Sequence, residues 1–327
     1  MVIEMKRNFL MKSGILAVSA VLFGLGFQSS ATLAPVKVDS AKTVDRAVAY
    51  ILQKGDAWIQ ERKCVSCHMI PGMVWSLSEV HPDEIPSVKD FGLRYRKVVE
   101  WTLKDALRSF PGSEGMGQIL MADLDRNGVA ETRPRMVSFA RTLLQKQAAD
   151  GSWAPWGQTP EQKRSTKEGR EAVTMWAILA LEKALGKEAS RAIARGRTTL
   201  TGPEGKQSSE WHVLRYQVAL QFKESSVAND QLQIILRAQN DDGGWGWVHG
   251  KESDAIATGQ TLYALSFGRK DQVRSAATKA IGFLNSTQLT DGSWSVKGTL
   301  AHRQTVVIPT SVYWGTTWAV IGLSRWD

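Results

Sequence analysis

Two cysteines and a histidine lie together in the first quarter of the chain, in the run Cys64-Val65-Ser66-Cys67-His68. This C-x-x-C-H spacing is typical of covalent haem attachment, in which each thiol forms a thioether with one vinyl group of the porphyrin. The histidine that follows coordinates the iron as an axial ligand. The sequence therefore predicts one covalent haem c, attached at Cys64 and Cys67 with His68 on the iron, and no other metal.

The same spacing has three other interpretations: a redox-active dithiol, half of a zinc site, or a structural disulfide. The chain has only 2 Cys, so no further cysteine is present to complete a zinc site. Around the motif we find no alternation of strands and helices, which is the context of thioredoxin-like dithiols. These observations favour haem attachment, and a disulfide is the interpretation if no haem is bound.

The ligand on the opposite face of the iron would decide between an electron carrier and an open, reactive iron. Met116 is our candidate for this distal ligand, because it lies 48 residues after His68 in a glycine-rich stretch that we predict to be a loop over 110–117. The competing residues are two nearby methionines and the remaining histidines: Met121, Met136, His81, His212, His249 and His302.

An amphipathic helix must lead into the attachment motif. Residues 44–63 place Val44, Val48, Ile51 and Ile59 at helical spacing, which predicts one apolar face. Many small c-type cytochromes have such a helix directly before the attachment cysteines, and this stretch resembles that pattern.

The N-terminus has the composition of a targeting segment. A basic start is followed by the apolar run 14–27 and by small residues at 29–31, which predicts a signal peptide over 1–31, cleaved or kept as an anchor. We therefore expect an exported protein, in the bacterial periplasm or at the extracytoplasmic membrane surface. The net charge of +9 suits an acidic or membrane-associated redox partner, with no role for nucleic acid, and the chain could be a subunit of a larger complex.

Three copies of one motif, Q-x-x-D-G-x-W, occur between residues 147 and 294. They end at Trp153, Trp245 and Trp294, spaced 92 and 49 residues apart, so a degenerate copy is expected between the first two. Apolar, small-residue stretches follow the motifs over 172–181, 255–265 and 311–323 and predict helices. Asp-Gly favours a tight turn with positive φ. The Gln can bond the backbone around that turn, and the Trp can pack against it.

This motif resembles the repeat of the prenyltransferase and squalene–hopene cyclase family. The resemblance covers roughly residues 130–327 and implies an all-α fold, an α/α toroid of stacked helix pairs. We expect a signal peptide over 1–31, a haem-bearing helical segment over 32–125 and the toroid over 126–327, the last two forming one structural unit. A group of bacterial exported proteins combines C-x-x-C-H with such repeats, and this chain is similar to them.

The sequence lacks the residues that carry out the known reactions of this family. The D-x-D-D acid of the polyprene cyclases is missing, and so are the zinc ligands of the prenyltransferases. We therefore expect an electron-transfer c-type cytochrome, with the toroid as scaffold or docking surface, rather than an enzyme. The alternatives are a haem enzyme or gas sensor with an open iron, a terpene-cyclase-like enzyme, or a polysaccharide-lyase-like enzyme. The last would use groups such as Trp211, His212, Arg215, Tyr216 and His249.

Overall fold

A computed structural model describes residues 40–62, 65, 69–109, 112–124, 132–303 and 305–326. The compact unit over 38–327 is built from α-helices, and in its described part β-structure is limited to isolated bridges. The expected all-α fold is therefore confirmed.

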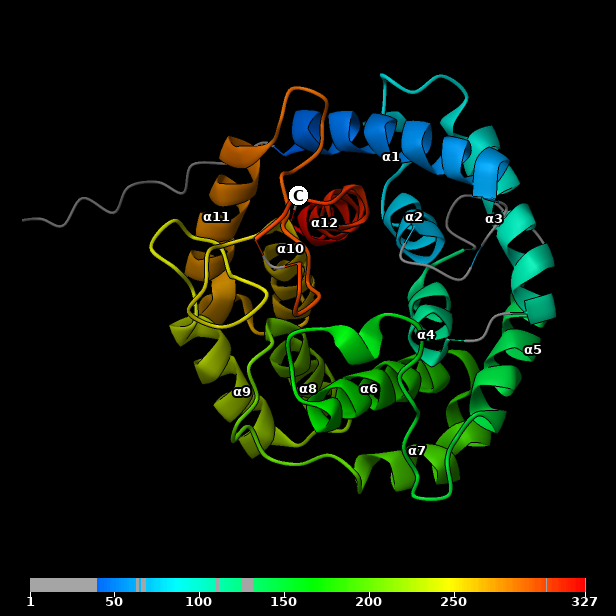
Figure 1. Cartoon of the computed structure of the whole chain (residues 1–327), viewed down its shortest axis with the longest axis vertical. Helices are drawn as coiled ribbons and strands as arrows, with labels where there is room; N and C mark the ends of the chain where they lie inside the picture. The colour runs from blue at the N-terminus through cyan, green and yellow to red at the C-terminus, as the bar shows by residue number, and fades with distance from the viewer. Residues whose placement is uncertain are drawn as a thin grey trace, which may run out of the picture. The chain divides into compact units, whose positions relative to one another are not determined.

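The helices alternate between an outer and an inner ring (Figure 1). The outer helices are α1 (Ala41–Arg62), α3 (Phe91–Ser109), α5 (Thr132–Gln145), α7 (Ser190–Arg197), α9 (Ser225–Arg237) and α11 (Lys270–Thr287). The inner helices are α2 (Met69–Ser78), α4 (Ser113–Met121), α6 (Thr166–Leu185), α8 (Ser209–Gln221), α10 (Ala255–Leu265) and α12 (Pro309–Leu323). Each inner helix contacts the next, and α12 contacts α2, so the inner ring is closed. This arrangement is an α/α toroid, as the repeats predicted.

Composition explains which helices lie inside. Every residue of α2 and of α10 is buried, as expected for a helix that is apolar or small-residue on all sides. The outer helices are amphipathic instead: α9 and α11 bury one face and leave polar residues exposed. None of the described helices is both long and apolar enough to cross a bilayer.

The three repeat motifs build the corners between outer and inner helices in the predicted way. Gly151, Gly243 and Gly292 all have positive φ, between 89° and 95°. In the first copy, the Gln147 side chain donates to the carbonyl of Gly151 in its own turn and to that of Ala192 in the next outer helix, both at 2.8 Å. The indole N–H groups of Trp153, Trp245 and Trp294 each donate to a main-chain carbonyl ten residues earlier, at 2.8–2.9 Å.

The last copy closes the ring. Gln288 donates to Gly292 of its own turn at 3.0 Å and to the carbonyl of Thr43 in α1 at 2.8 Å. Tyr313 of α12 donates to the carbonyl of Ile51 at 3.1 Å. The start of the described chain is thereby joined to its end, and the segments expected as haem-bearing part and toroid supply α1–α4 and α5–α12 of the same ring.

Aromatic side chains fill the axis of the inner ring. Trp75 packs with its ring centroid 5.7 Å from Trp176, 5.1 Å from Tyr263 and 5.0 Å from Trp318. These contacts are edge-to-face, the arrangement that aromatic quadrupoles favour. The toroid is therefore closed through its centre at this level.

One local prediction is wrong. The glycine-rich stretch around Met116 is not a loop, because residues Ser113–Met121 form α4. Its glycine at 117 permits close packing instead: a Cβ there would lie 3.2–3.4 Å from the side chain and backbone of Trp176 in α6. Gly117 thus lets two inner helices approach each other, at the cost of weak helix propensity.

Candidate functional site

The predicted haem ligands Cys64, Cys67 and His68 lie outside the described residues. Their flanks are defined: α1 ends at Arg62 and α2 begins at Met69. Between them, Val65 is buried in the hydrophobic core. In the part of the chain that the structure describes, no group of three or more His, Cys, Asp or Glu could hold a metal ion.

The candidate distal ligands are spread over the fold. Met116 is wholly buried in α4 within the hydrophobic core. Met121 and Met136 pack against that core from α4 and α5. His81 precedes the short helix Pro82–Glu84, and His302 is exposed in the loop before α12.

A pocket lies where three inner helices begin, close to the flanks of the attachment motif. It has a volume of about 240 Å³ and is bordered by the first turns of α2, α4 and α12, by the end of α1 and by the loop after Trp153. Its aromatic walls are Trp58 and Trp156, and Trp156 is 50% exposed. Its polar walls are Glu114, Gln118, Gln158, Thr159 and Thr310.

Glu114 is the one acid among the described residues that line this pocket. It lies in the first turn of α4 and is only 7% exposed. Thr159 donates a short hydrogen bond to its Oε2, while its Oε1 has no partner among the described residues. Burial, with repulsion from Glu210, raises the pKa of Glu114 to about 7, and Arg164 and the Thr159 hydroxyl only partly oppose this. A substantial fraction of Glu114 is therefore protonated at neutral pH.

A buried ion pair sets this electrostatic environment. Arg164 donates to Glu210 at 2.6 Å, and both side chains are only 1% exposed. Trp176 and Gln260 also donate to Glu210, at 3.3 and 3.4 Å. Glu210 thus accepts hydrogen bonds from three donors. Its negative charge raises the pKa of Glu114, while its own oxygens are occupied by these donors.

The other carboxylates at the starts of inner helices are fully engaged. Glu168 accepts from Ser208, whose N–H lies 2.7 Å away, and Glu171 accepts from Trp211 and Lys206 at 2.8 Å. Asp254 accepts main-chain N–H groups of Trp247 and Ala257 at 2.7 and 2.9 Å. Glu114 alone of this described set has an oxygen without a donor.

Gln118 extends the same site one helical turn further along α4. It is 3% exposed, and its Nε2 has no acceptor among the described residues. A buried donor without a partner costs free energy, so its presence beside Glu114 in a pocket wall points to a ligand-binding role. Sequence reasoning missed both residues. A lone acid in a glycine-rich stretch gives no signal until the fold brings Thr159 and Glu210 against it.

The groups considered for a lyase-like bowl are mostly engaged elsewhere. Trp211 donates to Glu171, and Arg215 pairs with Glu224 at 2.6 Å. His212 shares a hydrogen bond of 2.9 Å with Gln231 of the outer helix α9, so it lies between the two rings. Its ring stacks on His249, with centroids 4.5 Å apart.

The stacked histidines predict an acid-sensitive stability. Burial lowers the pKa of His212, and burial and repulsion from His212 lower that of His249 to about 4. Neutral rings are therefore favoured in the folded state, so this stability is complete above the unfolded pKa near 6.5 and is lost as the pH falls toward 4. Between pH 7 and 4.5, we expect His249→Phe to lose about 3 °C less in Tm than the wild type. The exposed His302→Phe serves as control, and parallel curves for all three proteins would contradict the prediction.

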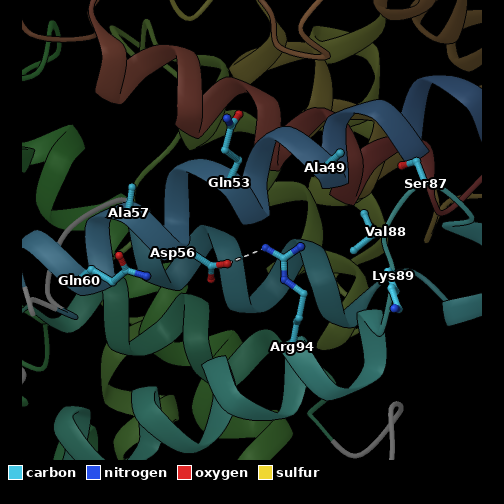
Figure 2. A pocket seen from close by; sticks show the side chains of 9 residues that line it. All are labelled: Ala49, Gln53, Asp56, Ala57, Gln60, Ser87, Val88, Lys89 and Arg94. Atoms are coloured by element: carbon cyan, nitrogen blue, oxygen red, sulfur yellow. Dashed lines mark hydrogen bonds and ion pairs between the residues drawn. The ribbon is translucent and has the colours of Figure 1, made fainter.

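A second hollow lies on the outer wall and is of a different kind. The groove of about 500 Å³ in Figure 2 runs between α1 and the segment that enters α3. Two of its three charged side chains point toward each other, and Arg94 binds Asp56 at 2.5 Å. Because Asp56 is paired with Arg94, the residues that line this groove offer no free acid.

Comparison with known proteins supports the fold. No family model matches the sequence, and no curated protein matches it either. A possible GH105 member from Salmonella enterica shares 12% identity at a TM-score of 0.59, over 91% of this chain and 95% of its own. A variant of the type II terpene cyclase MstE from Scytonema, bound to its product merosterolic acid A, gives 15% and 0.60 over 90% and 99%. The unsaturated glucuronyl hydrolase of Bacillus sp. GL1 gives 12% and 0.58 over 86% and 95%.

These similarities correct the functional expectation. We predicted an electron-transfer cytochrome rather than an enzyme, and the comparison contradicts this prediction. The solved structures named above, which share the toroid, are a possible GH105 member, a terpene cyclase and a glucuronyl hydrolase. The description as a cytochrome with a haem iron for electron transfer finds no counterpart among them. The enzyme alternatives fit better. At such low identities, the likeness itself establishes only the fold.

Proposed function

We propose that the chain is a hydrolase of a saccharide-like substrate, with Glu114 as its general acid. The observation that supports this most is a buried carboxyl, with its pKa raised to about 7, that borders a pocket with aromatic and hydrogen-bonding walls. A carboxylic acid with a pKa near the working pH is a suitable proton donor. Trp58 and Trp156 offer flat apolar faces for a sugar ring, and Gln118, Gln158 and Thr159 can bond hydroxyl groups.

The size and lining of the pocket favour this substrate over a polyprene. A long apolar chain needs a deep apolar cavity, whereas the ring axis is occupied by Trp75, Trp176, Trp318 and Tyr263. The pocket of about 240 Å³ beside Glu114 is small, and it carries amide and hydroxyl groups. The absence of a D-x-D-D run in the sequence agrees with this choice.

In the proposed reaction, the Glu114 carboxyl acts first as the proton donor and then as the proton acceptor. Glu114 donates its proton to the bridging oxygen of the substrate as the bond from carbon to that oxygen breaks. Water then attacks the resulting cation and returns a proton to the Glu114 carboxylate, so the enzyme is restored. Glu210 favours the protonated starting form through its charge, and Thr159 orients the carboxyl by donating to Oε2.

Substrate turnover tests the proposal directly. The wild-type chain is incubated with a panel of nitrophenyl glycosides and unsaturated oligosaccharides, and nitrophenolate and new reducing ends are measured. We expect turnover of at least one compound and a rate that falls above pH 7 as Glu114 loses its proton. No turnover across the panel, or turnover that is unchanged in Glu114→Gln, would overturn it.

A covalent haem on Cys64 and Cys67, with His68 on the iron, is a separate proposal that rests on the sequence motif. The described surroundings suit a porphyrin, since Met69, Ile70 and Val65 are buried and apolar. When bound, the haem would add an iron centre at the end of the ring where α2 begins. Coexpression with haem-maturation proteins should give an intact mass increased by one haem, and Cys64→Ala/Cys67→Ala should remove it. An unmodified mass would leave the two cysteines as a disulfide or free thiols.

Export directed by residues 1–31 is likewise proposed, and the N-terminal sequence of the mature protein tests it.

A further inference from the structure

Another cavity, distinct from the Glu114 pocket and from the groove in Figure 2, lies close to Arg164. It is bordered by Lys163, the residue before Arg164, and by Asp254 at the start of the inner helix α10. It has a volume of about 500 Å³ and lies between the loops that follow Trp245 and Trp294. Arg164 separates the two hollows, because it binds Glu210 on one side and lies 5.6 Å over the ring of Trp247 on the other. Trp247 borders this second cavity.

Three lysines reach the cavity from three separate segments. Lys163, Lys251 and Lys297 all line it, with the hydroxyl groups of Ser253, Ser295 and Thr305. Lys297 pairs with Glu252. In the described part of the chain, Lys163 and Lys251 have no acidic partner. With Glu252 and Asp254, the cavity lining holds three lysines and two acids, which leaves one positive charge in excess.

The loops that present these lysines are fixed by main-chain hydrogen bonds. Lys163 N–H donates to Thr299 at 3.0 Å, and Lys251 N–H donates to Val248 at 3.1 Å. Lys297 forms a bridge with Val307. Asp254, the other acid in the wall, accepts hydrogen bonds from the main-chain N–H groups of Trp247 and Ala257, one with each oxygen. The lysines therefore converge on a preorganised frame rather than on free surface loops.

A neutral donor adds to the same wall. Trp247 is 7% exposed, and its Nε1 has no acceptor among the described residues. An indole N–H can only donate, so it requires an acceptor when it is buried. The Ser253 hydroxyl is engaged, because it donates to Asp242. Two lysines without an acidic partner, the hydroxyl groups of Ser295 and Thr305 and an unsatisfied N–H share one preference, which is an anionic oxygen ligand.

We propose that this lysine-lined cavity binds an oxyanion, a sulfate, phosphate or carboxylate group of a small ligand. Lys163 and Lys251 provide the charge, and Trp247 and the hydroxyl groups of Ser295 and Thr305 provide directed hydrogen bonds. The proposal does not depend on the role of Glu114, and binding can be measured without any turnover.

Calorimetric titration of the full chain with sodium sulfate, sodium phosphate and sodium acetate, at constant low ionic strength, tests the site. We expect saturable binding of at least one anion, weakened about tenfold in Lys163→Gln/Lys251→Gln. Trp247→Phe keeps the ring and removes the N–H, and it should weaken binding about threefold. Binding of sulfate or phosphate alone assigns a tetrahedral group, and binding of acetate assigns a carboxylate.

A matched pair of lysines gives the control. Lys104 and Lys187 are exposed on α3 and on the short helix Gly186–Ala189, and neither lines the cavity. Lys104→Gln/Lys187→Gln removes the same charge and should change the affinity less than twofold. Equal loss in both double variants would mean general charge attraction only, and absence of saturable binding in the wild type would mean no site; either result overturns the proposal. Thermal unfolding confirms that each variant is folded.

Discussion

Glu114→Gln is expected to lower the rate on any substrate found in the glycoside panel by about 100-fold to 10,000-fold, because the amide cannot donate the proton that starts the reaction. The glutamine retains an oxygen that can accept from Thr159, so the local structure should be preserved. The wild-type rate should also fall above pH 7, where Glu114 ionises. The variant's residual rate should lack this dependence.

The same substitution should stabilise the fold at alkaline pH. The folded-state pKa of Glu114 lies at about 7, above its ordinary value of 4.5, so the folded chain binds this proton more tightly than the unfolded chain. Stability therefore falls as the pH rises from about 4.5 to about 7, and the loss persists above that range. Glu114→Gln removes the loss and should raise Tm at pH 8 on the order of 5 °C, with no gain at pH 4.

The exposed Glu161→Gln, in the neighbouring short helix Thr159–Glu161, is the matched control and should change neither rate nor Tm. A Glu114→Gln variant with full activity would contradict the general-acid role. A variant without the alkaline gain in Tm would instead show that Glu114 is not buried in protonated form. The two readouts thus separate the catalytic proposal from the electrostatic one.

Gly259→Ala is expected to destabilise the toroid by about 3 kcal/mol or more, enough to lower Tm by several degrees. Gly259 lies where α10 crosses α12, and a Cβ there would overlap the carbonyl group of Trp318 and lie 2.8 Å from the nitrogen of Ala319. A Cβ on Gly322 would likewise lie 2.6 Å from the oxygen of Gly259. Backbone atoms cannot turn away as a side chain can, so the two inner helices would have to separate.

Gly282→Ala is the control for this substitution. Gly282 lies in the outer helix α11, and a Cβ there would meet nothing within 4 Å. Because alanine favours helix over glycine, this variant should be more stable by about 0.5–1 kcal/mol. Chemical denaturation of both variants gives the comparison, and similar effects at the two positions would contradict the close crossing.

The toroid could be predicted because its corners are local. Gln147, its glycine and Trp153 lie within seven residues, and each contact that defines the turn is short-range apart from the bond to the next outer helix. The pair α3–α4 lacks this motif. The prediction of a loop was wrong for its inner helix, because glycine is common both in flexible segments and where two helices pack closely.

The candidate site could not be predicted in the same way. The properties of Glu114 arise from its burial, from the charge of Glu210 in a different inner helix, and from the hydrogen bond with Thr159, 45 residues away. No local pattern encodes that combination. The C-x-x-C-H run drew the functional prediction toward an electron carrier, because a short attachment motif specifies a cofactor and says little about the chemistry of the ring that bears it.

The closing contacts of the ring constrain the order in which the chain can fold. The bond from Gln288 to Thr43 spans 245 residues, and that from Tyr313 to Ile51 spans 262. On the ribosome, α1 emerges well before α12, yet the face of α1 that carries Val44, Ile51 and Leu52 packs in part on α12. Such distant contacts are slow to form because loop closure must precede them. Part of the apolar face of α1 therefore stays exposed until α12 has been synthesised, and a chaperone that binds this face would be most effective during that interval.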